Sequence, residues 1–203
     1  NVAARVKRCI DIDCEPLYHP VPDAEKFRTG AFDAYIFAPS RLEPLKRQHL
    51  LIEAMQYVKS PVRAIIAGEG TLGEHYRSLV ESLGLAGRVE LPGNVVGERK
   101  FALYANSLAV FFAPFDEDYG YITLEGMLSG KPVITTVDAG GPREFVRHDD
   151  TGFVLEADPR AIAEVIDRLY ANRALALRMG EAGRIHYRSL GISWDNVVDA
   201  LLC

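Results

Sequence analysis

Two glutamates that flank a glycine are the most informative residues of this sequence. Glu117 and Glu125 stand eight positions apart, with Gly120 between them, where an apolar run ends and a helical pattern begins. A helix N-terminus at the carboxyl end of a buried parallel strand favours phosphate through its N–H groups and dipole, and carboxylates accept hydrogen bonds from hydroxyls. The pattern indicates a ligand with phosphate between two sugars, such as a nucleotide sugar. An exposed acidic loop followed by a surface glutamate is the alternative.

Two cations are expected at the same edge of the sheet. Arg41 and Lys46 follow the first predicted strand, and the carboxyl ends of parallel strands meet at one edge. Arginine offers a planar fork of donors and lysine a point charge, so together they could neutralise a departing diphosphate without a divalent metal. A solvated basic loop is the alternative. The neighbouring basic residues Arg47 and His49 are expected on a helix surface.

A glycine-rich loop supports a competing hypothesis. Gly68, Gly70 and Gly73 spell G-x-G-x-x-G after a predicted strand, and Glu90 follows at about the distance of a ribose-binding acid. An NAD-dependent oxidoreductase would place its dinucleotide on such a loop. Against this, the motif follows the second strand, Glu69 adds a negative charge to the loop, and no second half supplies a substrate site. A tight strand-to-helix turn explains the glycines without a cofactor.

An acidic cluster and a cysteine-containing cluster are weaker candidates, each for a metal site. Residues 116–118 contain an Asp-x-Asp spacing that could hold magnesium or manganese beside a diphosphate, but the arginine and lysine make such a metal unnecessary. Cys9, Cys14 and His19 lack a fourth ligand for zinc. We therefore expect no metal site. Together with Cys203, the cysteines form an odd set that suits reduced thiols.

Apolar runs along the chain predict the strands and helices on which these residues lie. Six such runs alternate with helical patterns, which is typical of a doubly wound, Rossmann-like α/β sheet of about six parallel strands with flanking helices. The predicted strands are 35–38, 62–67, 89–91, 108–113, 132–136 and 152–155. The predicted helices are 46–57, 73–83, 98–106, 121–129, 142–146, 159–171 after an Asp158 cap, 174–189 and a last one from Ser193.

Length and charge limit the functions that the chain can have. At 203 residues with 48% hydrophobic content, it is expected to form one domain at 31–191, after an irregular, proline-containing linker segment at 1–30. A net charge of −5 without a long basic run argues against nucleic acid as a partner. No apolar stretch approaches the roughly 20 residues that span a bilayer. The chain is expected to be soluble and cytoplasmic.

Several short motifs, in this order, resemble those of one enzyme family. They are Ser40-Arg41-Leu42 with Lys46, IAGEG at 66–70, VELPG at 89–93, Ala113-Pro114 before the glutamate pair, GKPVI at 130–134, GGP at 140–142 and TGF at 151–153. From about Tyr35 to Trp194, the chain resembles the carboxyl-terminal, donor-binding domain of group 1 (family 4) retaining glycosyltransferases. The resemblance implies one half of a GT-B fold and an enzyme that transfers a hexosyl group from a nucleoside diphosphate sugar, with no further cofactor.

The resemblance also implies a role for each candidate residue. Arg41 and Lys46 would hold the diphosphate, and Glu117 would contact hydroxyls of the donor sugar, so these three are the catalytic candidates. Glu125 would bind the ribose. The remaining substrate-binding candidates are backbone groups beside the phosphate, at Gly120, Tyr121, Ile122 and Thr123, and the loop beside the base, at Gly93, Asn94 and Val95.

The sequence departs from the family pattern at five positions. Arg47 replaces a glycine, Asn106 an aspartate and Gly126 an alanine, while Tyr119 and Tyr121 stand where a phenylalanine and a small aliphatic residue are usual. We expect these departures to affect fine specificity more than the class of activity.

The resemblance implies a partner domain that this sequence does not contain. Group 1 enzymes have an amino-terminal domain that binds the acceptor, here expected to be a saccharide or a lipid-linked sugar. Residues 192–203 would begin the terminal helix that crosses to it, so we expect one half of a two-domain enzyme, inactive alone because closure excludes water. Peripheral membrane attachment is left open for the full-length enzyme. A nucleotide-sugar-binding module without catalysis is a further alternative.

Overall fold

A single parallel sheet forms the centre of the computed structural model, which describes residues 1–202; Cys203 lies outside the described residues. The strand order is β3-β2-β1-β4-β5-β6, and each neighbouring pair is parallel. The strands are β1 Tyr35–Pro39, β2 Arg63–Ala67, β3 Val89–Glu90, β4 Ala109–Phe111, β5 Val133–Thr136 and β6 Gly152–Leu155. The predicted doubly wound α/β sheet is confirmed.

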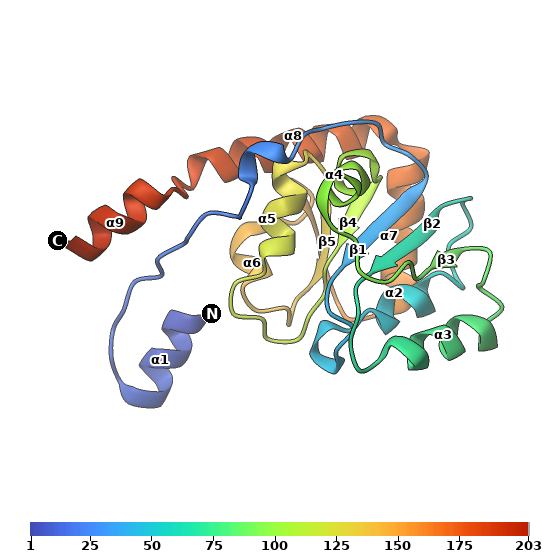
Figure 1. The fold of residues 1–203 in the computed structure, drawn as a ribbon, viewed down its shortest axis with the longest axis horizontal. Coiled ribbons are helices and arrows are strands. Elements are labelled where there is room, and N and C mark those ends of the chain that lie inside the picture. The colour runs from blue at the N-terminus through green and yellow to red at the C-terminus, as the bar shows by residue number, and fades with distance from the viewer. Residues whose placement is uncertain (203) are drawn as a thin grey trace.

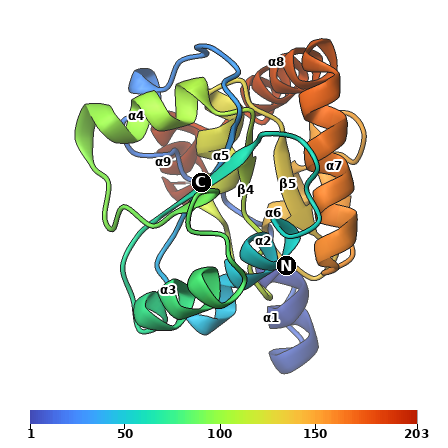
Figure 2. The same cartoon turned by 90° about the vertical axis from the view of Figure 1, so that its right-hand side faces the viewer.

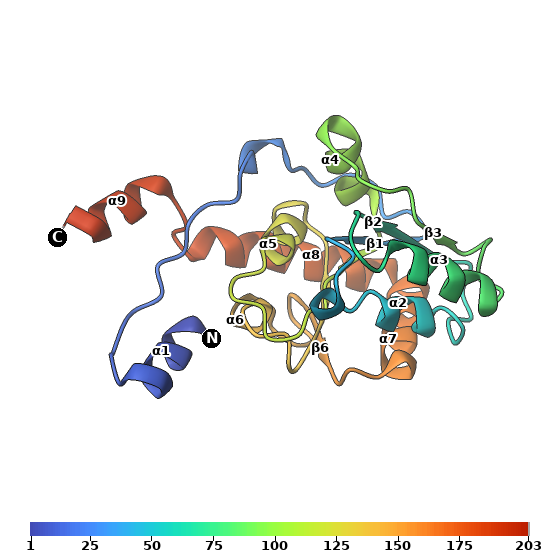
Figure 3. The ribbon, with the colours of Figure 1, turned by 60° about the horizontal axis from the view of Figure 1, so that its bottom comes forward.

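Helices cover both faces of this sheet. The α-helices are α1 Val2–Ile10, α2 His49–Ala54, α3 Gly73–Ser82, α4 Gly97–Asn106, α5 Tyr121–Leu128, α6 Pro142–Phe145, α7 Pro159–Ala171, α8 Arg173–Ser189 and α9 Trp194–Leu202, and two short 3₁₀ helices are η1 Ala24–Lys26 and η2 Pro44–Lys46. Figure 2 shows α4 and α7 on opposite sides of the strands, and Figure 3 shows the same separation of α4 from α2 and α7. Among residues 1–202, no helix is both long and apolar enough to cross a membrane.

The core is split by the sheet into two layers, as a strand buried on both faces requires. Along β1, Ile36 belongs to the cluster beneath α2, α3 and α7, whereas Tyr35 and Phe37 belong to the cluster beneath α4 and α5. Alternating side chains of one strand therefore enter different layers. This arrangement explains why the sequence of the central strands is continuously apolar.

The amino-terminal segment is more regular than predicted. The expectation of an irregular segment over residues 1–30 is wrong for α1, Val2–Ile10, and for η1, Ala24–Lys26. The prolines that suggested irregularity are confined to residues 16–22, so they interrupt the linker without preventing a helix before it. Figure 1 shows the linker running from α1 past α5 toward the sheet.

The linker is joined to the sheet domain by side-chain hydrogen bonds. The Thr29 hydroxyl accepts from the Arg184 guanidinium at 3.0 Å. Just after the linker, the side-chain carbonyl oxygen of Asn106 accepts from the backbone N–H of Ala31 at 2.9 Å. This contact gives Asn106, where relatives were expected to have aspartate, a structural role at the end of α4. At the other end of the chain, α9 leaves the tip of α8 (Figure 1), with Val197 buried and Trp194 exposed.

Candidate functional site

The strand order creates a crevice at the carboxyl ends of β1 and β4. From β1 the chain continues outward to β2, whereas from β4 it continues in the opposite direction to β5. Ligands of open α/β sheets bind at such a switch point. Arg41 and Lys46 follow β1, and Glu117 and Gly120 follow β4, so the topology alone brings the predicted catalytic residues to one place.

Gly120 sets the start of α5 against its neighbours. Its backbone is left-handed, with φ of 84°, and a Cβ at this position would lie 2.9 Å from Pro142 Cγ and 3.1 Å from Phe112 Cε1. Only glycine suits this turn. The Thr123 N–H donates to the Gly120 carbonyl at 3.0 Å, whereas the N–H groups of residues 121 and 122 lie in the first turn, where a helix supplies no acceptor.

The catalytic candidates line one cavity of about 410 Å³. Arg41, Lys46 and Glu117 all contribute to its wall, and the Lys46 Nζ donates to Glu117 Oε2. The predicted clustering of these three residues is therefore present in the structure. Asp116 and Asp118 line the same cavity, and both pair with the guanidinium of Arg5 on α1.

A second cavity, of about 460 Å³, brings together the residues expected around the nucleoside. Glu125 and Ile122 from α5 line it together with Asn94 and Val95, and Arg41 borders this cavity as well as the first. Gly93 is not among the residues that line this cavity, and its carbonyl accepts from the Gly68 N–H at 2.8 Å. Arg41 thus lies between the two groups of candidate residues.

Lys100 and Tyr104, two residues of α4 that the sequence did not single out, hold the Glu125 carboxylate. The Lys100 Nζ donates to Glu125 Oε1 at 2.6 Å, and the Tyr104 hydroxyl donates to Glu125 Oε2. Burial and, secondarily, the negative charge of Glu125 raise the pKa of Tyr104 well above its ordinary value, which keeps this phenol protonated as a donor. The four-residue spacing of Lys100 and Tyr104, which puts both on one face of α4, is the signal that the sequence contained.

Arg47 is not on a helix surface, contrary to the prediction. It precedes α2 with a left-handed φ of 52°, and α2 begins only at His49 instead of at Lys46. The Arg47 guanidinium donates to both carboxylate oxygens of Asp138 at 2.7 and 2.8 Å. It also donates to three acceptors at the ends of β4 and β5, namely the carbonyls of Ala113 and Pro114 and the hydroxyl of Thr136.

These bonds make Arg47 a tie between the chain that follows β1 and the ends of the two neighbouring strands. The hydrogen bond from Arg47 is the main reason that the pKa of Asp138 lies below its ordinary value. The left-handed φ also explains why glycine is usual at this position. Arg47 therefore anchors the loop that carries Lys46 to the ends of β4 and β5.

The glycine-rich loop is packed tightly against the loop that carries Arg41. A Cβ on Gly68 would lie 1.9 Å from the Ser40 carbonyl oxygen, and one on Gly70 would lie 2.5 Å from that of Leu42. The motif thus has a packing explanation that needs no dinucleotide. Glu90, the acid that the competing hypothesis assigned to ribose, lies 4.0 Å from the guanidinium of Arg99.

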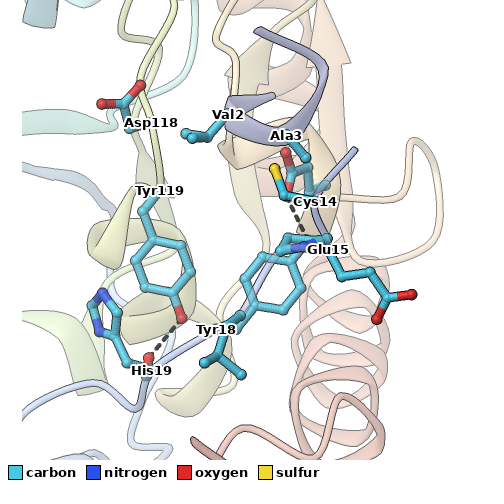
Figure 4. A pocket seen from close by; sticks show the side chains of 11 residues that line it. Val2, Ala3, Cys14, Glu15, Tyr18, His19, Asp118 and Tyr119 are labelled. Carbon is cyan, nitrogen blue, oxygen red and sulfur yellow. Dashed lines mark hydrogen bonds between the residues drawn. The ribbon is translucent and has the colours of Figure 1, made fainter. Parts of the chain in front are cut away.

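The two tyrosines that depart from the family pattern contact the linker. The Tyr119 hydroxyl donates to the His19 carbonyl at 2.6 Å, and the Tyr121 hydroxyl lies 2.6 Å from His19 Nδ1. Figure 4 shows Tyr18, His19 and Tyr119 around a small third cavity beside α1, which Cys14 also lines. Among residues 1–202, no group of three or more His, Cys, Asp or Glu side chains is placed to hold a metal ion.

Comparison with known proteins shows the family and the fold. The chain matches the model for glycosyl transferases group 1 over residues 23–186. A putative glycosyltransferase EpsD of Bacillus subtilis is 31% identical over 75% of this chain and 40% of its own length. The human alpha-1,3/1,6-mannosyltransferase ALG2 is 31% identical over 84% of this chain and 43% of its own length. The chain therefore spans less than half of these relatives.

Solved structures show the same fold. The structure of Anabaena HepE in complex with UDP and glucose has a TM-score of 0.76 and 24% identity, covering 86% of this chain and 52% of that one. Sucrose-phosphate synthase from Thermosynechococcus elongatus has a TM-score of 0.85 and 22% identity, covering 98% of this chain and 54% of that one. Such structural neighbours are GT-B glycosyltransferases. The chain belongs to the group 1 glycosyltransferase family.

Proposed function

We propose that this chain is the donor-binding half of a retaining glycosyltransferase of family 4, which transfers a hexosyl group from a nucleoside diphosphate sugar to a saccharide or lipid-linked acceptor. The observation that supports this most strongly is the position of Arg41 between two cavities. One contains Lys46 and Glu117, and the other contains Glu125 and the 94–95 loop. That order suits a ligand with a sugar, a diphosphate and a nucleoside in sequence.

In this proposal, the diphosphate lies between Arg41, Lys46 and the start of α5. When the bond between the anomeric carbon and the diphosphate oxygen breaks, the electron pair stays on the diphosphate. The guanidinium, the ammonium and the amides of the first helical turn stabilise the developing charge. The acceptor oxygen forms the new bond to the anomeric carbon and passes its proton to the departing diphosphate oxygen, and the configuration at that carbon is retained.

Glu117 orients the donor sugar in the same proposal. Its carboxylate pairs with Lys46 and has further lone pairs for sugar hydroxyls. Glu125 plays the corresponding part for the ribose, and the backbone around Asn94 and Val95 lies beside the base. The UDP complex of the structurally similar HepE supports the use of a nucleoside diphosphate by this fold.

The amino-terminal half that binds the acceptor belongs to the proposal as well. The matched relatives are more than twice as long as the segment they share with this chain. Because closure of two domains completes a site and excludes water, we expect this half to bind donor but to transfer little alone. That expectation also separates a transferase from a module that binds without catalysing, since only the former gains activity when the other half is supplied.

Calorimetric titration of the chain with UDP, GDP, ADP and NAD, each with and without Mg²⁺, tests the proposed donor site. We expect one nucleoside diphosphate to bind without needing the metal. Glu125→Gln should weaken that binding by about 10-fold or more, because charged acceptors contribute on the order of 1.5–3 kcal/mol. Glu90→Gln, the matched control at the exposed acid of the competing hypothesis, should leave it unchanged. Tight NAD binding that depends on Glu90 but not on Glu125 would overturn the proposal.

A further inference from the structure

Lys100 lies at the wall of the nucleoside cavity and contacts the carboxylate assigned above to ribose. It belongs to α4, and it reaches across to Glu125 on α5, with 2.6 Å between its Nζ and Glu125 Oε1. Tyr104, one turn further along α4, donates its hydroxyl to the other carboxylate oxygen, Oε2. Each oxygen of the carboxylate is therefore held by one donor from the same face of one helix.

The carboxylate needs these donors because it is buried. Glu125 is 7% exposed and Tyr104 is fully buried. A charge removed from water at such a position is costly unless it is paired and hydrogen-bonded. The lysine supplies the opposite charge, and the phenol supplies the second bond. Together they fix the direction in which the remaining lone pairs of Glu125 point.

Lys100 is itself held in place by aromatic rings. Its Nζ lies 5.3 Å from the ring centroid of Phe27 and 5.9 Å from those of Phe101 and Tyr104. Ring faces at such distances attract an ammonium. One of the rings, Phe27, comes from the linker before β1, so a distant segment of the chain contributes to the position of this lysine.

One side of the Lys100 and Glu125 pair is open to the cavity. The side chain of Lys100 is 30% exposed, and both residues line the cavity wall. A carboxylate has about four acceptor positions, and Lys100 and Tyr104 use two of them. Among residues 1–202, no further protein donor bonds to this carboxylate.

We propose that Lys100 is a positioning residue that, by holding Glu125 toward the cavity, makes this site select ribonucleotides over 2′-deoxyribonucleotides. The inference rests on the proposed donor site. A ribose presents vicinal 2′ and 3′ hydroxyls to the fixed carboxylate. A 2′-deoxy sugar leaves one of the charged acceptor positions unfilled in a partly buried site, and such a loss reduces affinity by about 10- to 100-fold.

Affinities for UDP, GDP and their 2′-deoxy counterparts, measured by calorimetry, test this inference on the wild-type chain and its Lys100→Met variant. Methionine keeps an apolar stem on the rings but removes the charge. We expect the ratio of ribo to deoxy affinity to fall from about 10- to 100-fold to less than about 3-fold. Lys100→Arg, which retains a cation, should keep most of the ratio. Arg99→Met removes a charge from the same helix at a residue whose side chain is 63% exposed, and it should leave the ratio unchanged.

The affinity for inorganic pyrophosphate, which has no ribose, tells whether Lys100 acts by positioning Glu125 or by attracting anions through its charge. If Lys100 acts through Glu125, Lys100→Met should change pyrophosphate affinity little while it reduces the ribo-to-deoxy ratio. An equal loss for pyrophosphate and nucleotide would overturn the inference, as would an unchanged ratio in Lys100→Met. Should Lys100→Met fail to fold, Tyr104→Phe removes the other donor and is expected to lower the same ratio. If the wild-type chain binds no nucleoside diphosphate at all, the proposed function itself fails.

Discussion

Arg47 provides the sharpest test of how the site is supported. Truncation to alanine removes the pair with Asp138 and the donors to Ala113, Pro114 and Thr136. It also leaves a residue with a Cβ at a φ of 52°. Glycine at the same position loses the same bonds but adopts this backbone without strain. Comparing Arg47→Ala with Arg47→Gly therefore separates the contribution of the side chain from that of the backbone.

The expected magnitudes follow from the geometry. Loss of hydrogen bonds to charged groups costs about 1.5–3 kcal/mol each in isolation, but the bonds of one guanidinium are not additive. The Arg47 side chain is 14% exposed and that of Asp138 is 36% exposed, so solvent screens part of the pair. We expect Arg47→Ala to lower the free energy of unfolding by about 2–4 kcal/mol. Arg47→Gly should lose roughly 1 kcal/mol less, because a left-handed backbone costs an L-residue about 1–2 kcal/mol and glycine loses some of this advantage to chain entropy.

Urea unfolding of the wild-type chain and both variants gives these values, and its pH dependence checks their cause. Since the folded pKa of Asp138 is lowered mainly by Arg47, the contribution of the pair is fully present at neutral pH. It should decline as the pH falls below the ordinary aspartate value of 3.8. The difference between wild type and Arg47→Ala should therefore narrow in acid. A cost below about 0.5 kcal/mol, the size of ordinary surface substitutions, would contradict a supporting role for Arg47, and so would an alanine variant as stable as the glycine one.

Three further predictions concern the Gly120 turn, the buried amine of Lys131 and the proposed diphosphate contact of Arg41. Gly120→Ala should lower the free energy of unfolding in urea by about 2 kcal/mol or more and abolish nucleotide binding in calorimetry. Gly84 is also left-handed but has open space around it, so Gly84→Ala should lower the free energy of unfolding by only about 1–2 kcal/mol. Burial lowers the pKa of Lys131 to about 7, so above that pH the unfolded chain binds one proton more than the folded chain. The free energy of unfolding of the wild type should therefore rise from pH 7 toward 10. In thermal melts, Lys131→Met should remove this rise. Arg41→Ala should weaken nucleoside diphosphate binding by about 10- to 100-fold. Arg63→Ala, at the amino-terminal end of β2 and thus at the opposite edge of the sheet, should leave that binding unchanged.

The sheet was predictable because each strand carries its own local signal. The apolar run at residues 152–155 coincides with β6, and the other predicted strands agree within about two residues at each end. Buried parallel strands must be apolar on both faces, so their positions can be read without knowing their neighbours. The clustering of Arg41, Lys46 and Glu117 followed from the same logic, because parallel strands end at one edge. Their roles toward a ligand remain predictions.

What the sequence did not reveal depends on contacts between distant segments. The partner of Arg47 lies 91 residues away, at Asp138, and nothing local distinguishes that arginine from a surface residue. The pairing of Lys100 with Glu125 depends on how α4 and α5 face each other across the cavity. The prolines at residues 16–22 predict an irregular linker, but they follow α1 and say nothing about the residues that form it.

A crystal structure of the chain with the nucleoside diphosphate that it binds would locate the diphosphate, the ribose and the base relative to the candidate residues. We expect the diphosphate between Arg41, Lys46 and the amides at the start of α5, with the ribose on Glu125 and the base beside Asn94. A diphosphate over the Gly68 turn, the position expected for a dinucleotide, would rule out the proposed donor site.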